Sequence, residues 1–147
     1  RGSSDGISPG DLVVAADEYG RLAAAGRIKD VSKPTATVVT LFSDECRFSV
    51  ILASSRHVGG LEFDPYTRVP EVKYLPADGT YAEGELVATS GISSHTPHGL
   101  PIGRVVKSAN GNIATIRNQM FAEVEVKPFL KLDTVKYVAV YTKRSGK

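Results

Sequence analysis

The sequence predicts an all-β protein that forms two small β-barrels or β-sandwiches of similar plan. Val, Ile and Thr, the β-branched residues, account for 34 of the 147 residues, whereas Leu and Met together account for 11. Fourteen Gly and eight Pro supply turns. Apolar and polar side chains also alternate: Ala122, Val124 and Val126 face one way, and Glu123 and Glu125 the other. These observations favour short strands joined by turns over long helices.

Eleven segments in succession have strand-like patterns. They are Leu12–Ala16, Arg21–Val31, Thr35–Phe42, Phe48–Leu52, Arg56–Phe63, Arg68–Leu75, Glu85–Ser90, Pro101–Lys107, Ile113–Ile116, Ala122–Lys127 and Tyr137–Tyr141. Turn signals separate them at Lys33-Pro34, Asp64-Pro65, Pro76–Gly79 and Asn110-Gly111. Asn110-Gly111 predicts a tight hairpin, because both residues tolerate positive φ. Only residues 21–25, between Gly20 and Gly26, could instead form a helical turn.

An internal repeat divides the chain into two halves. Gly10-Asp11-Leu12-Val13 recurs as Gly84-Glu85-Leu86-Val87, and Gly26-Arg27-Ile28 recurs as Gly103-Arg104-Val105. A β-branched stretch follows in each half, Thr37–Thr40 and then Ile113–Ile116, and after it an alternating strand, Phe48–Leu52 and then Glu123–Val126. The repeat predicts two subdomains of similar plan.

The repeat also sets the expected domain organisation. Residues 1–9 read as a tag remnant and linker, residues 10–82 as the first β-barrel, residues 83–143 as the second, and residues 144–147 as a solvated tail. Strands before Gly10 and after Phe129 could close either barrel, so strand exchange between the two halves stays open.

Charge and apolar content exclude several functional classes. Lys and Arg number 18 against 16 Asp and Glu, for a net charge of +2 without a long basic run, which argues against nucleic-acid binding. No apolar stretch approaches the length of a membrane helix. The single cysteine, Cys46, excludes an internal disulfide and a multi-cysteine metal site.

Histidines offer a weak case for a metal. His95 and His98 lie three residues apart, but Pro97 places them in a loop, and no cysteine or carboxylate stands close in sequence. Zinc requires three or four ligands in fixed geometry. We therefore expect no metal site here.

A catalytic set is equally hard to assemble. His57, Asp64 or Asp78, and Ser90 would supply the residue types of a serine hydrolase, but Ser90 has no nucleophile-elbow context. Cys46 follows Asp44 and Glu45, which would raise its pKa, so it reads as an idle thiol. The sequence predicts no catalytic residue and no cofactor.

Aromatic side chains remain as candidate contacts. Phe63 and Tyr66 flank the Asp64-Pro65 turn, and rigid aromatics near turns are favoured anchors in protein interfaces. We single out both as candidate partner contacts, with packing inside the fold as the equal alternative.

One segment carries a family resemblance. Gly84-Glu85-Leu86-Val87-Ala88-Thr89-Ser90-Gly91, followed by Pro97-His98-Gly99-Leu100-Pro101-Ile102-Gly103-Arg104-Val105, resembles the signature of the MreC family of bacterial rod shape-determining proteins. That signature runs Gly-Asp-x-Val-x-Thr-Ser-Gly, then a loop with Pro and Gly, then Gly-x-Pro-x-Gly-x-Val. Glu85 stands where the family usually has Asp, and the loop 92–95 is more polar than expected. The weaker similarities extend from Gly10 to Thr142.

The resemblance implies a non-catalytic scaffold of the cell-elongation complex that maintains rod shape. It implies two β-barrel subdomains of about six strands each, on the outer, periplasmic side of the cytoplasmic membrane and anchored by an upstream membrane helix. The implied partners are a class B penicillin-binding transpeptidase, MreD, RodA, the MreB system and further copies of the same chain, as dimers or filaments. Two alternatives stay open: a small β-barrel serine-type hydrolase, and a β-barrel adaptor of a membrane transport assembly.

The residues of the motif point first to a structural role. Thr89 and Ser90 can hydrogen-bond to backbone at a strand end. Gly84, Gly91, Gly99 and Gly103 permit positive φ or close approach of two backbones, and Pro97 and Pro101 stiffen the loop. We expect the motif to shape the barrel rather than to contact a partner.

Overall fold

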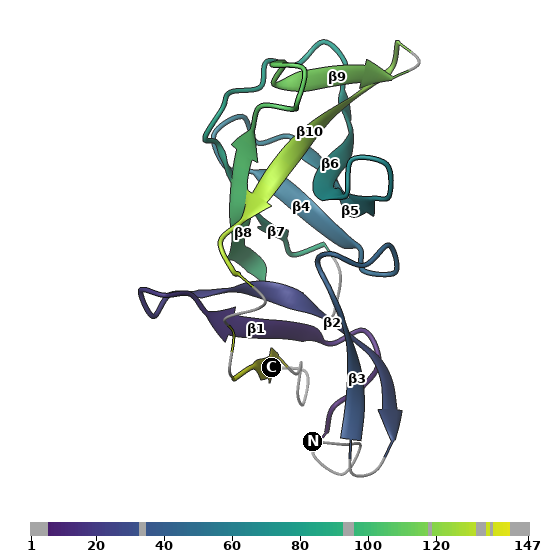
Figure 1. Ribbon diagram of the computed structural model, residues 1–147, viewed down its shortest axis with the longest axis vertical. Helices are drawn as coiled ribbons and strands as arrows, with labels where there is room; N and C mark the ends of the chain where they lie inside the picture. Colours follow the sequence, from purple (N-terminus) through teal and green to yellow (C-terminus); the bar gives the residue numbers. More distant parts are fainter. Residues whose placement is uncertain are drawn as a thin grey trace.

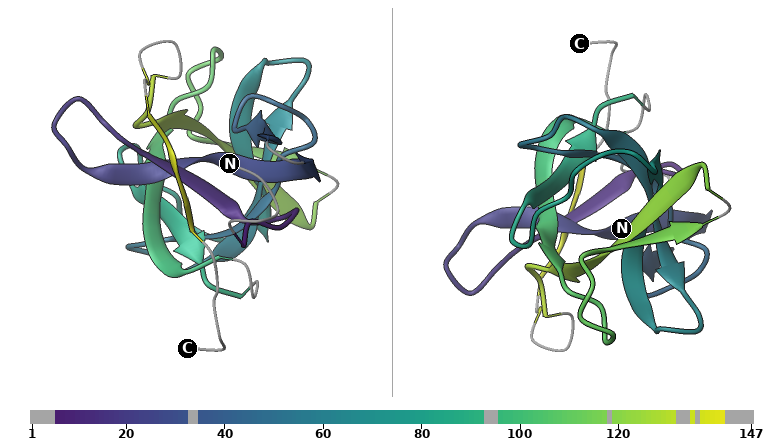
Figure 2. Two further views of the ribbon diagram at one scale, coloured as in Figure 1. Left: turned by 90° about the horizontal axis from the view of Figure 1, so that it is seen from below. Right: turned by 90° about the horizontal axis from the view of Figure 1, so that it is seen from above.

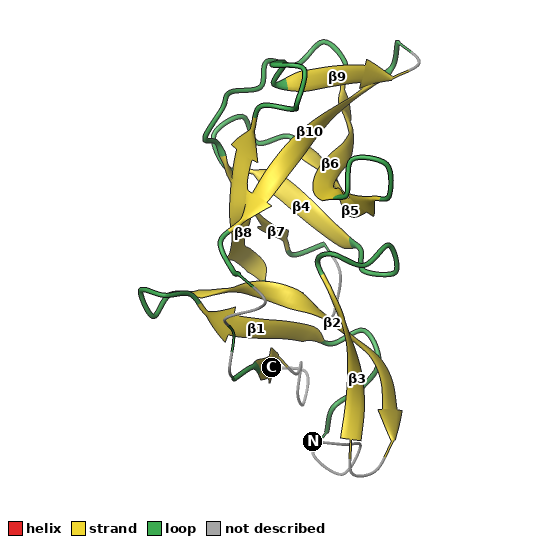
Figure 3. Cartoon of the chain, in the orientation of Figure 1, coloured by secondary structure: helices red, strands yellow, loops and turns green. Residues whose placement is uncertain are grey.

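The computed structural model describes residues 6–32, 35–92, 96–117, 119–131, 135 and 137–141. Within them the chain forms eleven strands, no helix, and hence no helical membrane span (Figures 1 and 3). The strands are β1 (Leu12–Ala16), β2 (Leu22–Ser32), β3 (Thr35–Thr40), β4 (Phe48–Leu52), β5 (Val58–Asp64), β6 (Val69–Pro76), β7 (Leu86–Ser90), β8 (His98–Val106), β9 (Ala114–Arg117), β10 (Phe121–Pro128) and β11 (Ala139–Tyr141). The all-β prediction is confirmed.

The strands form two sheets. Seven strands in the order β6-β5-β4-β7-β8-β10-β9 make one sheet, and a further pairing of β6 with β10 closes six of them into a barrel. Strand β9 pairs with the first half of β10, and β8 pairs with its second half. Figure 2 looks along the long axis of the molecule and shows the barrel strands arranged around it. The other sheet has the order β11-β1-β2-β3 and lies at one end of the barrel (Figure 1).

The sheets divide the chain differently from the halves expected at 10–82 and 83–143. Strand β4 pairs with β7 and strand β6 with β10, both in the expected second half, and β5 lies between β4 and β6. The change of sheet therefore falls between β3 and β4. The physical reason is that a sheet of β4, β5 and β6 alone would have two exposed edges. Strand β7 covers the edge of β4, and β10 covers the edge of β6. After Phe129 the chain returns to the first sheet, where β11 pairs with β1. A C-terminal strand therefore completes the N-terminal unit.

The internal repeat corresponds to a repeat in the structure, but the third strand of the second copy is not the one expected. In each copy the two segments bond reciprocally: Gly10 N–H donates to Ile28 O (2.7 Å) as Gly84 N–H donates to Val105 O (2.7 Å). Gly26 pairs with Thr40 of β3, and Gly103 pairs with Pro128 of β10. The counterpart of β3 is thus β10, rather than Ile113–Ile116 in β9, and Phe48–Leu52 does not correspond to Glu123–Val126.

The two repeat glycines explain this pairing. A Cβ on Gly26 would lie 2.0 Å from the Val39 carbonyl oxygen, and one on Gly103 would lie 2.2 Å from that of Lys127. Only glycine admits so close a backbone approach. Each repeat glycine therefore lies where the neighbouring third strand comes closest to the second.

One local expectation is confirmed and one is wrong. The strand expected at Arg21–Val31 is present as β2, where Ala23 and Ala24 pair with Ala15 and Val14 of β1 and form no helical turn. Asn110-Gly111 does form a turn, with Gly111 at φ +86°, but it does not make a hairpin. Strands β8 and β9 each pair with β10 instead of with one another.

The hydrophobic core runs without a break from the barrel into the first sheet. Leu12, Val14 and Ala24 pack in the same cluster as the buried barrel residues Phe48, Val50, Leu52, Leu61, Val72, Leu75, Val87, Ile102, Val105, Ala122, Val124 and Val126. Burial of this apolar surface holds the sheet and the barrel together.

The Arg27 side chain adds polar contacts at this junction. Its guanidinium donates to the carbonyls of Arg47 (2.8 Å) and Gly10 (2.7 Å) and to the Thr96 hydroxyl (2.8 Å), and it lies 4.5 Å from the centre of the Phe48 ring. Burial lowers the pKa of Arg27. A single cation thus bonds the first sheet, the β3–β4 connection and the segment before β8.

We predict that Arg27→Met destabilises the domain by about 2–4 kcal/mol, because three acceptors at the junction lose their donor. Arg104, the repeat counterpart, is the matched control. It is exposed, bonds the Gly84 carbonyl (2.8 Å) and lies over Phe129, so Arg104→Met should cost less than about 1 kcal/mol. Urea unfolding of both variants measures the difference, and equal losses would contradict the assignment of Arg27 as the junction residue.

Candidate functional site

The motif segment forms the β7–β8 connection, and Thr89 lies at its centre. The buried Thr89 hydroxyl donates to the Pro97 carbonyl (2.5 Å) and accepts from the Leu100 N–H (2.9 Å). One side chain therefore ties the end of β7 to both sides of the start of β8. These bonds support a structural role for Thr89.

Ser90 faces the neighbouring strand. Its hydroxyl donates to Ser49 Oγ (2.8 Å) and accepts from the Ile92 N–H (3.3 Å). The side chain thus links the end of β7 to the beginning of β4, which is the use of serine expected at a strand end.

The glycines and prolines of the motif set the path of the backbone. Gly91 has φ +77°, and a Cβ there would lie 2.8 Å from His98 Cβ. Gly84 and Gly99 also have positive φ, whereas Gly103 is required by the close approach of β10. Pro101 pairs with Ala88, where the register of β7 and β8 shifts. All these features act on the local backbone.

Phe63 and Tyr66 differ in environment. Phe63, on β5, is half-buried and packs edge-on against Phe42, with ring centres 6.2 Å apart. Tyr66, in the β5–β6 turn, is 92% exposed. Phe42, which follows β3, is also exposed and was missed by the sequence reasoning, because no alternating pattern marks it. Phe42, Phe63 and Tyr66 are the aromatic contact candidates.

The residues considered for a hydrolase triad do not assemble. The His57 carbonyl accepts from the Leu52 N–H at the end of β4, whereas Ser90 bonds Ser49 near its start, about 10 Å away along the strand. The His57 ring packs on Tyr81 instead, with centres 5.4 Å apart. Asp64 bonds Thr67 and Lys73, and Asp78 lies near Tyr81, whose pKa burial and the Asp78 charge raise.

The metal reading receives no geometric support. His95 lies outside the described residues, and His98 is exposed at the start of β8. No group of three His, Cys, Asp or Glu side chains in the described part of the chain could hold a metal ion.

Cys46 is a buried free thiol, as the sequence suggested. Its pKa is raised to about 11, but the main cause is burial rather than the charges of Asp44 and Glu45, with the Arg27 cation acting in the opposite direction. A thiol with this pKa is a poor nucleophile.

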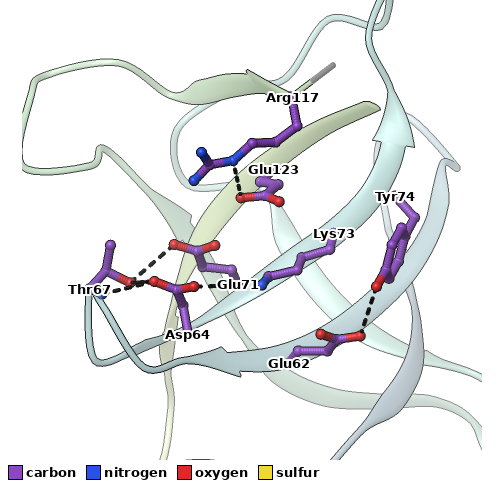
Figure 4. A network of polar contacts seen from close by, with 8 residues as sticks. All are labelled: Glu62, Asp64, Thr67, Glu71, Lys73, Tyr74, Arg117 and Glu123. Carbon is purple, nitrogen blue, oxygen red and sulfur yellow. Dashed lines mark hydrogen bonds and ion pairs between the residues drawn. The ribbon is translucent and has the colours of Figure 1, made fainter. Parts of the chain in front are cut away.

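A network of polar side chains covers the outer face of the barrel at its closure (Figure 4). The Asp64 carboxylate accepts from the Thr67 N–H (2.8 Å) and hydroxyl (3.0 Å) and pairs with Lys73 Nζ (3.6 Å). The Thr67 hydroxyl also lies 3.1 Å from Glu71 Oε2. Across the sheet, Arg117 Nε donates to Glu123 Oε1 (3.1 Å). Strands β5, β6, β9 and β10 thus bring two ion pairs, Asp64–Lys73 and Arg117–Glu123, and the further carboxylate of Glu71 to one surface.

Glu71 is the unusual member of this network. It is only 4% exposed, and its Oε1 atom has no hydrogen-bond partner. Burial, the Asp64 charge and the proximity of Glu123 raise the pKa of Glu71 to about 7, against the opposing bond from Thr67. By contrast, burial would raise the pKa of Asp64, but the bonds from Thr67 and Lys73 outweigh it and leave that pKa lowered.

The raised pKa predicts that stability falls as pH rises. Between pH 4.5, the ordinary value, and about 7, the folded state holds the Glu71 proton more tightly than the unfolded state. The stability associated with that proton is present below pH 4.5 and is lost as pH rises through 7. Glu71→Gln should therefore be more stable than the parent at pH 8, by on the order of 1–3 kcal/mol, and similar to it at pH 4.5.

Urea unfolding at several pH values measures this effect, with Glu83→Gln, at an exposed turn position, as control. A gain from Glu71→Gln that is the same at every pH would contradict the assignment.

Comparisons with known proteins agree with one another. The family model "Rod shape-determining protein MreC, barrel core" matches residues 1–142. The cell shape-determining protein MreC of Listeria monocytogenes is 31% identical over 111 residues, which are 73% of this chain and 36% of that protein. The chain thus spans little more than a third of this relative.

Solved structures share the fold. MreC of L. monocytogenes superposes with a TM-score of 0.79 at 26% identity, over 95% of this chain and 64% of that one. MreC from Pseudomonas aeruginosa gives 0.77 at 23% identity, over 95% and 84%. MreC from Helicobacter pylori, solved in complex with the penicillin-binding protein PBP2, gives 0.68 at 15% identity, over 87% and 76%.

Proposed function

The chain belongs to the MreC family of rod shape-determining proteins, and on that premise we propose that it is a non-catalytic scaffold that binds peptidoglycan-synthesis proteins. The observation that carries the proposal is the family match over residues 1–142. The scattered positions of His57, Ser90 and Asp64 are consistent with a binding role rather than a hydrolytic one.

The principal partner in this proposal is a class B penicillin-binding transpeptidase. A structural relative, the H. pylori protein, was solved in complex with PBP2. We extend the proposal to MreD, RodA and the MreB system, which the family resemblance implies, and to self-association, in line with the description of another relative as a cell shape-determining filament. That relative is also described as a periplasmic domain, and we place this chain likewise on the outer side of the cytoplasmic membrane, held by a membrane helix elsewhere in the protein.

The aromatic contact candidates are the proposed contact surface. Tyr66 projects from the β5–β6 turn, and Phe42 and Phe63 form an edge-on pair that is partly open to solvent. Aromatic anchors of this kind dominate the binding energy of many protein interfaces. The motif residues Thr89 and Gly91 would act indirectly, by holding the barrel in shape.

We predict that Tyr66→Ala and Phe63→Ala each weaken binding to the organism's own class B transpeptidase about tenfold or more. Tyr66→Ala should leave the unfolding midpoint unchanged, because its side chain is exposed. Tyr19→Ala is the matched control: Tyr19 is 75% exposed but lies in the β1–β2 turn of the other sheet. Calorimetric titration measures the affinities.

The outcomes separate the two parts of the proposal. Unchanged affinity in both variants removes Phe63 and Tyr66 from the interface and leaves the partner in place. No binding by the unaltered domain contradicts the partner itself.

A further inference from the structure

A cavity of about 260 Å³ opens on the outer face of the barrel, beside the network of Figure 4. It lies between β6, β9, β10 and the loop that precedes β9. Its carboxylates are Glu71, Glu123 and Glu125, and its neutral polar lining includes Thr67 and Asn110. Side chains from four separate parts of the chain therefore converge on one concave surface.

Negative charge dominates this cavity. Asp64 on β5, Glu71 on β6, and Glu123 and Glu125 on β10 face it or adjoin it. One cation, Arg117, also lines the cavity, where it is paired with Glu123, and Lys73 is paired with Asp64. Within the described residues neither Glu71 nor Glu125 makes an ion pair, although the Arg117 charge acts on Glu71 from a distance.

Strand register makes the arrangement intrinsically unfavourable. Glu71 stands directly opposite Glu62 on β5 and directly opposite Glu125 on β10. Like charges at directly opposed positions destabilise a sheet. Burial and the Asp64 charge also raise the pKa of Glu125, which shows that the charged form is disfavoured there too. A sheet that keeps three carboxylates in a row lacks the cation that would relieve them.

The Glu71 side chain gives the second, independent observation. It is more than nine-tenths buried, it lines the cavity, and its Oε1 atom has no partner. A buried carboxylate oxygen requires a hydrogen-bond donor, which is either a proton or a bound cation. In the neutral state the Glu71 proton meets this need through a hydrogen bond with Glu123. In the ionised state a donor has to reach Oε1 from the cavity that Glu71 lines.

The lining favours an ammonium group over a metal ion. No three His, Cys, Asp or Glu side chains in the described ranges are arranged to hold a metal. An ammonium carries three donors, which two carboxylates and one neutral oxygen can accept. Ile113 supplies an apolar wall beside the carboxylates, as a methylene stem would require.

We propose that this cavity binds a protonated primary amine on a methylene stem, with Glu71 and Glu125 as its anionic partners. A lysine side chain of a partner protein and a free small amine both carry this group. The site is distinct from the aromatic contact candidates and does not depend on transpeptidase binding.

Binding should strengthen as pH rises from 6 to 8. The amine requires the ionised Glu71. Among the described residues, the groups that face Glu71 are Glu62 and Asp64 from β5, Thr67 from the turn, Lys73 from β6, Arg117 from β9, and Glu123 and Glu125 from β10. A bound cation and a bound proton exclude one another at Glu71 Oε1.

The test is an amide NMR titration of the domain with n-butylammonium at pH 6 and pH 8, with n-butanol as the uncharged control of the same stem. Saturable shifts around Thr67, Ile113 and Glu123, at millimolar concentration (about 1–10 mM), are expected with the amine only. Affinity should be several-fold higher at pH 8. Glu71→Gln should weaken it at least tenfold, and Glu83→Gln should not change it.

Each outcome of the titration either supports or contradicts the amine-binding proposal. A lysine-containing peptide that binds more tightly than n-butylammonium assigns the group to a protein partner, and equal affinities assign it to a free amine. Equal shifts with n-butanol, no saturation, or displacement of the amine by low Ca²⁺ would overturn the proposal. Because the titration uses only the domain and small probes, its failure leaves the scaffold proposal standing.

Discussion

The pairing of β6 with β10 is the constraint on which the rest of the structure depends. It closes six strands into a barrel and removes two edges that would otherwise be exposed. The same register buries Val72 and Val124 on the inside and sets Glu71 opposite Glu125 on the outside. Closure therefore creates both the core and the acidic cavity, and neither could exist in the separate halves of the chain.

A repeated local device serves two purposes in this fold. In both copies a glycine, Gly26 or Gly103, allows a third strand to pair at close distance. The next residue is an arginine that donates to the carbonyl of the glycine at the start of the repeat, Gly10 or Gly84. In the second copy Arg104 stays exposed. In the first copy Arg27 reaches further, to Arg47 and Thr96, and joins the sheet to the barrel. The Gly-Arg motif thus joins the sheet to the barrel only in the first copy, where more acceptors lie within reach of the arginine.

Two kinds of surface remain available to partners, and their chemistry differs. The exposed ring of Tyr66 and the Phe42–Phe63 pair offer apolar area, whereas the neighbouring cavity offers uncompensated carboxylates. Thr67 lines the cavity and is adjacent to Tyr66 in the chain, so the two surfaces are close. The row of opposed carboxylates breaks a local rule of stability on an otherwise well-packed barrel, which is the pattern expected at a binding site.

The sequence by itself determined the strands, the family and the roles available to each motif residue. Alternating side chains and turn residues are local signals, so all eleven segments were found, and the glycine spacing revealed the repeat. The tertiary structure decided which strands are neighbours. Pairing depends on closure across distant segments, so β10, rather than β9, became the counterpart of β3, and β11 returned to β1. For the same reason no local pattern could place Glu71 among Glu62, Glu123 and Glu125: burial and opposed charge arise only when β5, β6 and β10 meet.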